Sequence, residues 1–301
     1  MRNILVPLDG TEISEAALRW AAGAAYRSGS SLRLISVVSN APDARMTPDS
    51  AGQYLEQKAR VLAADGLKVD CEVIDGDASE VILQQAGHSD LTVLTSGTTR
   101  WFVSEVLDRV LQSMSSALVI VRGDRGQLKG AINLDSILVP FSEANYSSAV
   151  LPATVEVATA LRAKLTLFRN VEVRGDEPGS NGLPPIVPRT LKAQMMEAEE
   201  YVDDSAEQLR SEGLEVQTMI SCGDHVTEIV KAARTVGAGI IAMATRGRDR
   251  LENRISGSVA NSVLEAATVA CLIVRTSERS QALGVSVARP MADAVSPPGN
   301  I

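Results

Sequence analysis

A stretch in the second half of the chain has the residue types and the spacing of a phosphate-binding loop. Nine residues separate Gly247 from Gly257, and Ser258 follows directly at the predicted start of a helix. Glycine lets the main chain approach a phosphate closely, and the free N–H groups at a helix N-terminus attract anions. Four arginines and two acids lie in the same stretch: Arg246, Arg248, Arg250, Arg254, Asp249 and Glu252. This local excess of positive charge, in a chain with a net charge of -8, predicts a phosphate ligand.

The composition argues against several other kinds of site. His88 and His225 are the two histidines, and no H-E-x-x-H or G-x-S-x-G pattern occurs, so the usual hydrolytic machinery is not expected. The three cysteines lie far apart, which argues against a disulfide framework or a zinc site. No basic stripe offsets the negative net charge, so nucleic acid is not an expected partner. No apolar run reaches the roughly 18 residues that span a bilayer, so we expect a cytoplasmic protein with no membrane partner.

The elements that must position the loop come from an internal duplication. Several landmarks recur in the same order: Ile4–Pro7 as Ile137–Pro140, Gly66–Val69 as Gly213–Val216, Gly76–Asp77 as Gly223–Asp224, Thr95–Gly97 as Thr245–Gly247, and Ile120–Arg122 as Ile273–Arg275. Between the first and second pairs of landmarks, the second copy holds 14 additional residues. We interpret them as a surface insertion around Asp176–Pro188 rather than a new element, because this stretch is rich in glycine and proline.

Each copy alternates short apolar runs with longer amphipathic ones, which is typical of βαβ units on a mainly parallel sheet. We predict strands at 2–8, 31–38, 67–75, 90–96 and 117–122, and at 135–141, 164–171, 214–221, 238–244 and 270–275. The fold class is α/β: two tandem doubly wound domains, each a five-stranded mainly parallel sheet with helices on both faces and strand order 3-2-1-4-5. The predicted domains are 1–123 and 135–276, with a linker at 124–134 and a disordered tail at 277–301.

In such a sheet a ligand lies where the winding reverses, at the carboxyl ends of the first and fourth strands. In the second copy, strand ends, the glycine loop and the start of the next helix would form this crevice. The residues that we predict to bind the cofactor are Pro140, Phe141, Ser142, Val171, Ala244, Arg246, Gly247, Arg248, Gly257, Ser258, Val259 and Ala260. Gly257 and Ser258 could instead simply begin a helix, because serine is a favoured N-cap.

The set of motifs resembles the universal stress protein family, over nearly the whole chain, as a tandem of two such domains. The family's nucleotide motif, G-x-x-G-x9-G-[ST], matches the second copy from Gly247 to Ser258, with Ala244 in place of the first glycine. In ATP-binding members, the aspartate of a V-P-x-D pattern helps to recognise adenine. The first copy matches this pattern at Asp9, whereas the second copy has Ser142.

The first copy departs from the phosphate motif of that family. Its loop after the fourth strand is three residues shorter, lacks the second glycine and carries Glu105 where the second copy has Ser258. A carboxylate there would repel a phosphate, so we predict no ATP in the first copy. A helix-capping pair is then enough to explain Asp9 with Thr11. We interpret Trp101–Phe102 as packing residues, with an apolar contact surface as the alternative.

The resemblance implies a stress-response regulator that binds ATP or a related adenine nucleotide, with or without Mg²⁺, in the second domain only. It allows at most slow ATP hydrolysis or autophosphorylation, and neither a catalytic residue nor a metal ligand is assigned. The alternative is a nucleotide-free scaffold or chaperone-like binding protein with degenerate pockets. The family pairs edge strands between domains, so we expect the last strands, at 118–121 and 272–274, to pair within the chain as a pseudo-dimer. A homodimer is also compatible with the resemblance.

Overall fold

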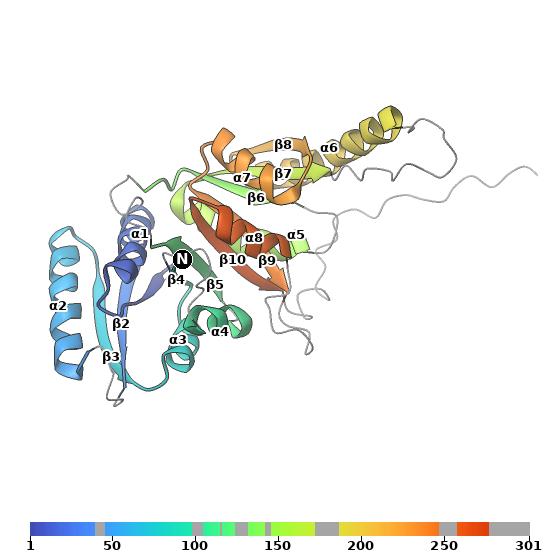
Figure 1. Ribbon diagram of the computed structural model, residues 1–301. Coiled ribbons are helices and arrows are strands. Elements are labelled where there is room, and N and C mark those ends of the chain that lie inside the picture. Colours follow the sequence, from blue (N-terminus) through green and yellow to red (C-terminus); the bar gives the residue numbers. More distant parts are fainter. Residues whose placement is uncertain are drawn as a thin grey trace, which may run out of the picture.

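Both copies contribute five strands to one continuous sheet, which runs through the molecule in Figure 1. The computed structural model describes residues 1–39, 46–97, 105–114, 116–123, 132–141, 146–171, 187–246 and 258–276. The strand order is β3-β2-β1-β4-β5-β10-β9-β6-β7-β8. Each half therefore has the predicted order 3-2-1-4-5, and the α/β class is confirmed. The two sheets are not separate, however, because they merge where β5 pairs with β10.

The elements alternate between strand and helix along both copies. In the first copy they are β1 (Asn3–Pro7), α1 (Glu12–Ser28), β2 (Ser31–Val38), α2 (Pro48–Ala64), β3 (Val69–Asp75), α3 (Ala78–Ala86), β4 (Leu91–Ser96), α4 (Glu105–Ser113) and β5 (Ala117–Arg122). In the second they are β6 (Ser136–Pro140), α5 (Tyr146–Leu161), β7 (Lys164–Val171), α6 (Val187–Ser211), β8 (Val216–Cys222), α7 (His225–Thr235), β9 (Ile240–Arg246), α8 (Ser258–Ala266) and β10 (Ala270–Thr276). The predicted strand bounds differ from these by at most two residues.

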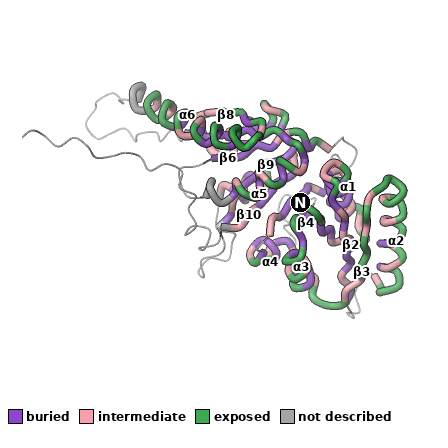
Figure 2. Tube along the Cα trace, turned by 180° about the vertical axis from the view of Figure 1, so that it is seen from behind, coloured by how far each residue is buried: buried purple, intermediate pink, exposed green. Residues whose placement is uncertain are grey.

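The strands read as continuous apolar runs because helices cover both faces of the sheet. One core cluster lies under α1, α2, α5 and α6, and it includes Ile4 and Val6 of β1. The other lies under α3, α4, α7 and α8, and it includes Leu5 of the same strand. Figure 2 shows the buried residues concentrated on the strands, with exposed residues on the outer surfaces of α2 and α6. Both clusters take residues from both copies, so the two halves share their cores.

The additional residues of the second copy lengthen a helix as well as a loop. Helix α6 has 25 residues, whereas its counterpart α2 has 17. The interpretation as a loop insertion alone is therefore incomplete, because Pro188 already belongs to α6. Proline is compatible with the first turn of a helix, where the N–H group it lacks would have no partner within the helix. The rest of the insertion, at 172–186, lies outside the described residues.

The sheet register corrects one of the landmark pairs. Ile4 pairs with Leu91, and its counterpart Ile137 pairs with Ile240. These pairs make Ile240 the counterpart of Leu91. The match of Thr95 to Thr245 would instead make Ile241 the counterpart of Leu91. That match is therefore one residue out of register. A coincidence of residue letters misled the comparison, because main-chain hydrogen bonds rather than letters define equivalent strand positions.

The two copies meet at an antiparallel strand pair. Val119 of β5 stands opposite Leu272 of β10, with Ile120 opposite Cys271 on one side. Val119 and Leu272 occupy the same place in the two copies, so each last strand pairs with its own counterpart. The expected pairing of the last strands within the chain is therefore present. Burial raises the pKa of the Cys271 thiol to about 12, which keeps it protonated inside this junction.

Polar contacts hold the copies together around these strands. Arg122 donates from Nη1 to the carbonyl oxygens of Glu265 and Ala267, both at 3.0 Å. Arg27 forms an ion pair with Asp135. The N-terminal amine lies 3.1 Å from the carboxylate of Glu156 on α5. Such bonds orient the halves, while the shared apolar cores supply most of the stabilisation.

The N-cap of α7 provides a pH-dependent prediction. Asp224 accepts hydrogen bonds from the main-chain N–H and the hydroxyl of Thr227, and these lower the pKa of Asp224. A lowered pKa means that the ionised carboxylate stabilises the fold above its unfolded pKa of about 3.9, and that this contribution is lost as the pH falls through the folded value. Asparagine also caps helices but carries no charge. We therefore expect Asp224→Asn to lower the Tm at neutral pH, and we expect this difference from the wild type to shrink as the pH falls below about 4. Melting curves from pH 7 downward test it; a difference that stays constant as the pH falls would contradict it.

Candidate functional site

The winding reverses between β6 and β9 in the second copy, and the predicted crevice belongs at their carboxyl ends. β6 lies between β7 and β9, and both neighbours run parallel to it. Pro140 ends β6, Val171 ends β7, and Arg246 ends β9. Helix α8 then begins at Ser258. The strands thus bring these predicted positions to one edge of the sheet, which is the edge where ligands bind in this class of fold.

Two of the residues predicted to contact the ligand, Phe141 and Ala260, are buried in the hydrophobic core. Phe141 is buried, and its ring lies 5.5 Å from the ring of Tyr201 on α6, centroid to centroid. Ala260 is buried in the core cluster on the opposite face of the sheet. Val171 is also buried, whereas Ala244 and Val259 are partly exposed. Phe141 and Ala260 thus belong to different core clusters, on opposite faces of the sheet.

The centre of the predicted phosphate loop lies outside the described residues. This applies to Ser142, Gly247, Arg248 and Gly257 of the predicted set, and to Trp101–Phe102 and the tail at 277–301. For Arg246 and Ser258 the structure describes the main chain alone. The site is therefore characterised by the elements that flank the loop.

The helices that follow the fourth strands differ in charge between the copies. Helix α4 begins with Glu105 and has Asp108 in its first turn, whereas α8 has no acidic residue in its first turn. Glu105 is exposed and lies 3.3 Å from Arg109, one turn further along α4. An anion at the N-terminus of α4 would meet two carboxylates, and an anion at the N-terminus of α8 would meet none from the helix itself. The first turn of α8 therefore carries less negative charge than the first turn of α4.

Asp9 of the first copy has a structural role in the loop before α1. Its Oδ1 accepts hydrogen bonds from the main-chain N–H of Thr11 at 3.1 Å and from the Thr11 hydroxyl at 2.6 Å. Thr11 in turn caps α1 by accepting from the N–H of Ser14 at 3.2 Å. This is the capping arrangement that the sequence allowed for Asp9 and Thr11.

Polar residues at the edge of the second copy were not among the predicted contacts. Asn170, near the end of β7, donates to the Gly223 carbonyl at 2.8 Å and lies 3.0 Å from Nδ1 of His225. His225 is thus a partly buried member of a polar cluster rather than a free surface residue. Arg169 is 8% exposed, and its guanidinium lies 5.6 Å from the centroid of the Tyr201 ring. These residues were hard to predict from the sequence, because Arg169 and Asn170 interrupt an apolar strand without forming a motif.

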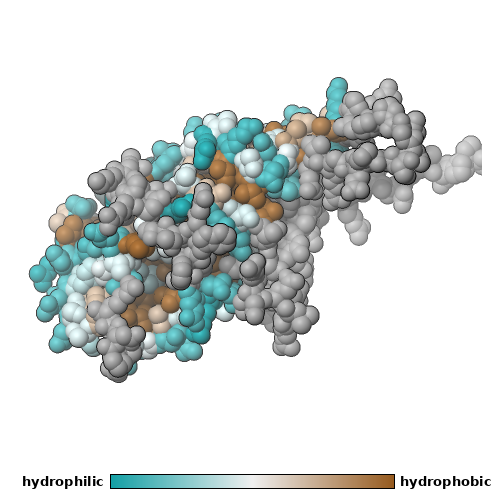
Figure 3. Space-filling view, viewed as in Figure 1, coloured by the Kyte–Doolittle hydropathy of each residue, from teal (hydrophilic) through white to brown (hydrophobic). Residues whose placement is uncertain are grey.

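The described residues were also compared with what a metal site and a membrane span require. Among the residues that the structure describes, no group of three or more His, Cys, Asp or Glu side chains could hold a metal ion. Of the helices in that part of the chain, none has the length and hydropathy that a membrane-spanning segment needs. On the face in Figure 3, apolar residues form separate patches among hydrophilic ones.

Comparison with known proteins places the chain in a family. A universal stress protein of Mycobacterium tuberculosis is 24% identical over 296 residues, which cover 91% of this chain and 97% of the relative. The crystal structure of a universal stress protein from Archaeoglobus fulgidus superposes with a TM-score of 0.66 at 18% identity, over 92% of this chain and 97% of that one. A universal stress protein crystallised in complex with cAMP covers 41% of this chain and 98% of its own, at 16% identity and a TM-score of 0.34. The universal stress protein family model matches residues 1–122 and 133–275, and the chain therefore belongs to this family as a tandem of two domains.

Proposed function

We propose that the chain is a cytoplasmic stress-response regulator that binds ATP or a related adenine nucleotide in its second domain. The observation that carries the proposal is the start of α8, which follows β9 at the winding reversal and has no acid in its first turn. The glycines and arginines of 247–257 lie in the connection between the two elements. Main-chain N–H groups at such a helix start would bind the phosphates, with Mg²⁺ as a companion ion. The two copies then act as a pseudo-dimer in which only the second domain keeps a nucleotide site. A homodimer of the whole chain would form through other surfaces.

A nucleotide-free scaffold is the second candidate, and Phe141 favours it. The ring of Phe141 packs against the ring of Tyr201. In the sequence, Phe141 directly precedes Ser142, which replaces the Asp9 of the first copy. Loss of one adenine hydrogen bond costs about 0.5–1.5 kcal/mol, roughly a tenfold loss of affinity. Native mass spectrometry of the purified protein discriminates between the candidates. Retained ATP supports the regulator, and a retained lipid or an empty protein supports the scaffold.

The decisive variant for the nucleotide site is Gly257→Asp. A carboxylate beside the start of α8 would repel the phosphates, and the side chain would obstruct the approach of the main chain. We expect ATP affinity to fall at least about a hundredfold in calorimetric titration with Mg²⁺, because several phosphate contacts are lost together. The matched control is Gly52→Ala on α2, where an added Cβ meets nothing within 4 Å. Equal heats for Gly257→Asp and the wild type would remove the proposed phosphate site.

A further inference from the structure

A pocket of about 420 Å³ lies between the two domains, beside the strand junction. Helix α1 and the end of β5 contribute from the first domain, and α7 and the segments before β9 and β10 contribute from the second. Ile132 and Asn133, just before β6, complete the lining. Its size is within the range of small-molecule sites. The pocket lies at the amino ends of β9 and β10, whereas the nucleotide crevice lies at the carboxyl end of β9, so the two sites are distinct.

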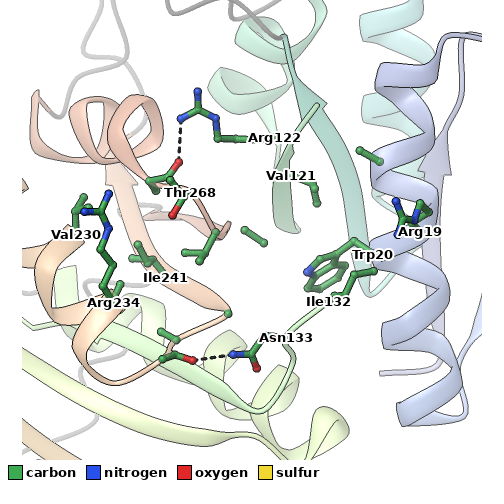
Figure 4. A pocket seen from close by; sticks show the side chains of 18 residues that line it. Arg19, Trp20, Val121, Arg122, Ile132, Asn133, Val230, Arg234, Ile241 and Thr268 are labelled. Carbon is green, nitrogen blue, oxygen red and sulfur yellow. Dashed lines mark hydrogen bonds between the residues drawn. The ribbon is translucent and has the colours of Figure 1, made fainter. Parts of the chain in front are cut away.

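The body of the pocket is apolar. Figure 4 shows Trp20, Val121, Ile132, Val230 and Ile241 around it, on both domains. Alanine and glycine residues fill most of the remaining wall. A wall of this kind favours the apolar part of a ligand.

The charged residues of the lining are all cationic. Arg19 lies on α1, Arg122 at the end of β5 and Arg234 on α7, and none of the described lining residues is Asp or Glu. Arg19 and Arg234 are exposed and form no ion pair with any residue in the described ranges. Arg122 is held in place by its two bonds to the carbonyls of Glu265 and Ala267. Two exposed arginines, Arg19 and Arg234, at a pocket in a protein of net charge -8 favour an anion.

Trp20 offers a hydrogen-bond donor without an acceptor. It is 3% exposed, and its indole N–H has no partner among the described residues. In Figure 4 the nitrogen edge of the ring faces the pocket. A buried donor without a partner carries a free-energy cost that a ligand acceptor can recover.

The duplication shows that the helix does not need these residues. Helix α5 is the counterpart of α1, and its residues at the places of Arg19 and Trp20 are Pro152 and Ala153. The fold therefore accepts side chains without charge or indole at these positions. Arg19 and Trp20 therefore occur in the first copy alone, and both line the pocket.

We propose that this pocket binds a small organic anion, with its apolar body against Trp20 and Ile241 and its carboxylate or similar acidic group against one of the two exposed arginines, Arg19 or Arg234. Figure 4 shows these arginines on opposite sides of the pocket, and the buried Trp20 and Ile241 lie in the wall between them. Both domains contribute contacts, so the ligand bridges them. This site is independent of the nucleotide crevice.

Titration with anilinonaphthalene sulfonate, an apolar anion that fluoresces in apolar sites, tests the proposal. The chain has two tryptophans, so Trp101→Phe leaves Trp20 as the sole indole reporter. In this background we expect saturable quenching of Trp20 emission by the probe. Phenylnaphthylamine, which has a similar body without the acid, should bind at least about tenfold more weakly, because each lost charge-assisted bond costs roughly that factor.

The decisive variant is Arg19→Gln with Arg234→Gln, and we expect it to weaken binding of the anionic probe at least about tenfold. Its melting temperature should not change, because both arginines are exposed. The matched control, Arg60→Gln with Lys164→Gln, removes the same charge from exposed residues outside the pocket and should bind as the wild type does. Gly257→Asp should also bind the probe normally. Absence of saturable quenching, equal binding of both probes, or loss of binding in Gly257→Asp alone would overturn the proposal.

Discussion

Replacing Gly239 by alanine is expected to lower the free energy of unfolding by about 3 kcal/mol or more. A Cβ built on Gly239 would lie 1.9 Å from the carbonyl oxygen of Asn133 and 2.6 Å from its carbonyl carbon. These are main-chain atoms, so no side-chain rotation can relieve the clash. Asn133 is also held by its own bonds: its Nδ2 donates to Gly237 at 2.7 Å, and its Oδ1 accepts from the N–H of Asp135 at 2.9 Å. Either the start of β9 or the segment before β6 must move.

Urea denaturation of Gly239→Ala and Gly52→Ala would measure this effect. Gly52 lies inside α2 with open space around its missing Cβ, so alanine there should raise stability by about 0.5–1 kcal/mol through helix propensity. The pair separates a clash from the general effect of adding a methyl group. If Gly239→Ala unfolds at the wild-type urea concentration, the close approach of the two segments is not present in solution.

Truncation of Leu272 should destabilise both domains together, by about 2–5 kcal/mol. Leu272 is fully buried at the centre of the strand junction, opposite Val119. It belongs to a core cluster that contains residues of both domains. A cavity there removes packing from both halves at once, so we expect Leu272→Ala to unfold in one transition with a lower midpoint.

Calorimetry and urea denaturation followed by fluorescence would detect this. The control is Val61→Ala on α2, which truncates an apolar side chain that is 61% exposed and should change stability by less than about 0.5 kcal/mol. Two separate transitions in Leu272→Ala, with only the second domain weakened, would show that the domains unfold independently.

The fold was predictable because its signals are local and repeated. Strands such as Ile137–Val139 are apolar throughout, and turn residues mark their ends, so the parallel sheet follows from alternation with helices. Because the pattern occurs twice, the position of each strand could be predicted once in each copy and the two predictions compared. The lengthening of α6 was not predictable, because prolines and glycines near its start indicate a loop and give no measure of where a helix begins.

The elements that flank the candidate site were predictable, but the packing of its side chains was not. The winding reversal places Pro140 and Arg246 at one edge whatever their side chains are. Whether Phe141 faces a ligand or packs on Tyr201 depends on α6, which lies about 50 residues further along the chain. The pocket between the domains gave no sequence signal, because Arg19, Arg122 and Arg234 come from three distant elements.

The pairing of each last strand with its own counterpart changes how the protein responds to dilution. Separate subunits joined by the same surface would dissociate once their concentration fell below the dissociation constant. Here the complementary strand belongs to the same polypeptide, so its effective concentration is fixed by the chain and does not depend on how much protein a cell contains. A site built from both halves therefore persists at any expression level.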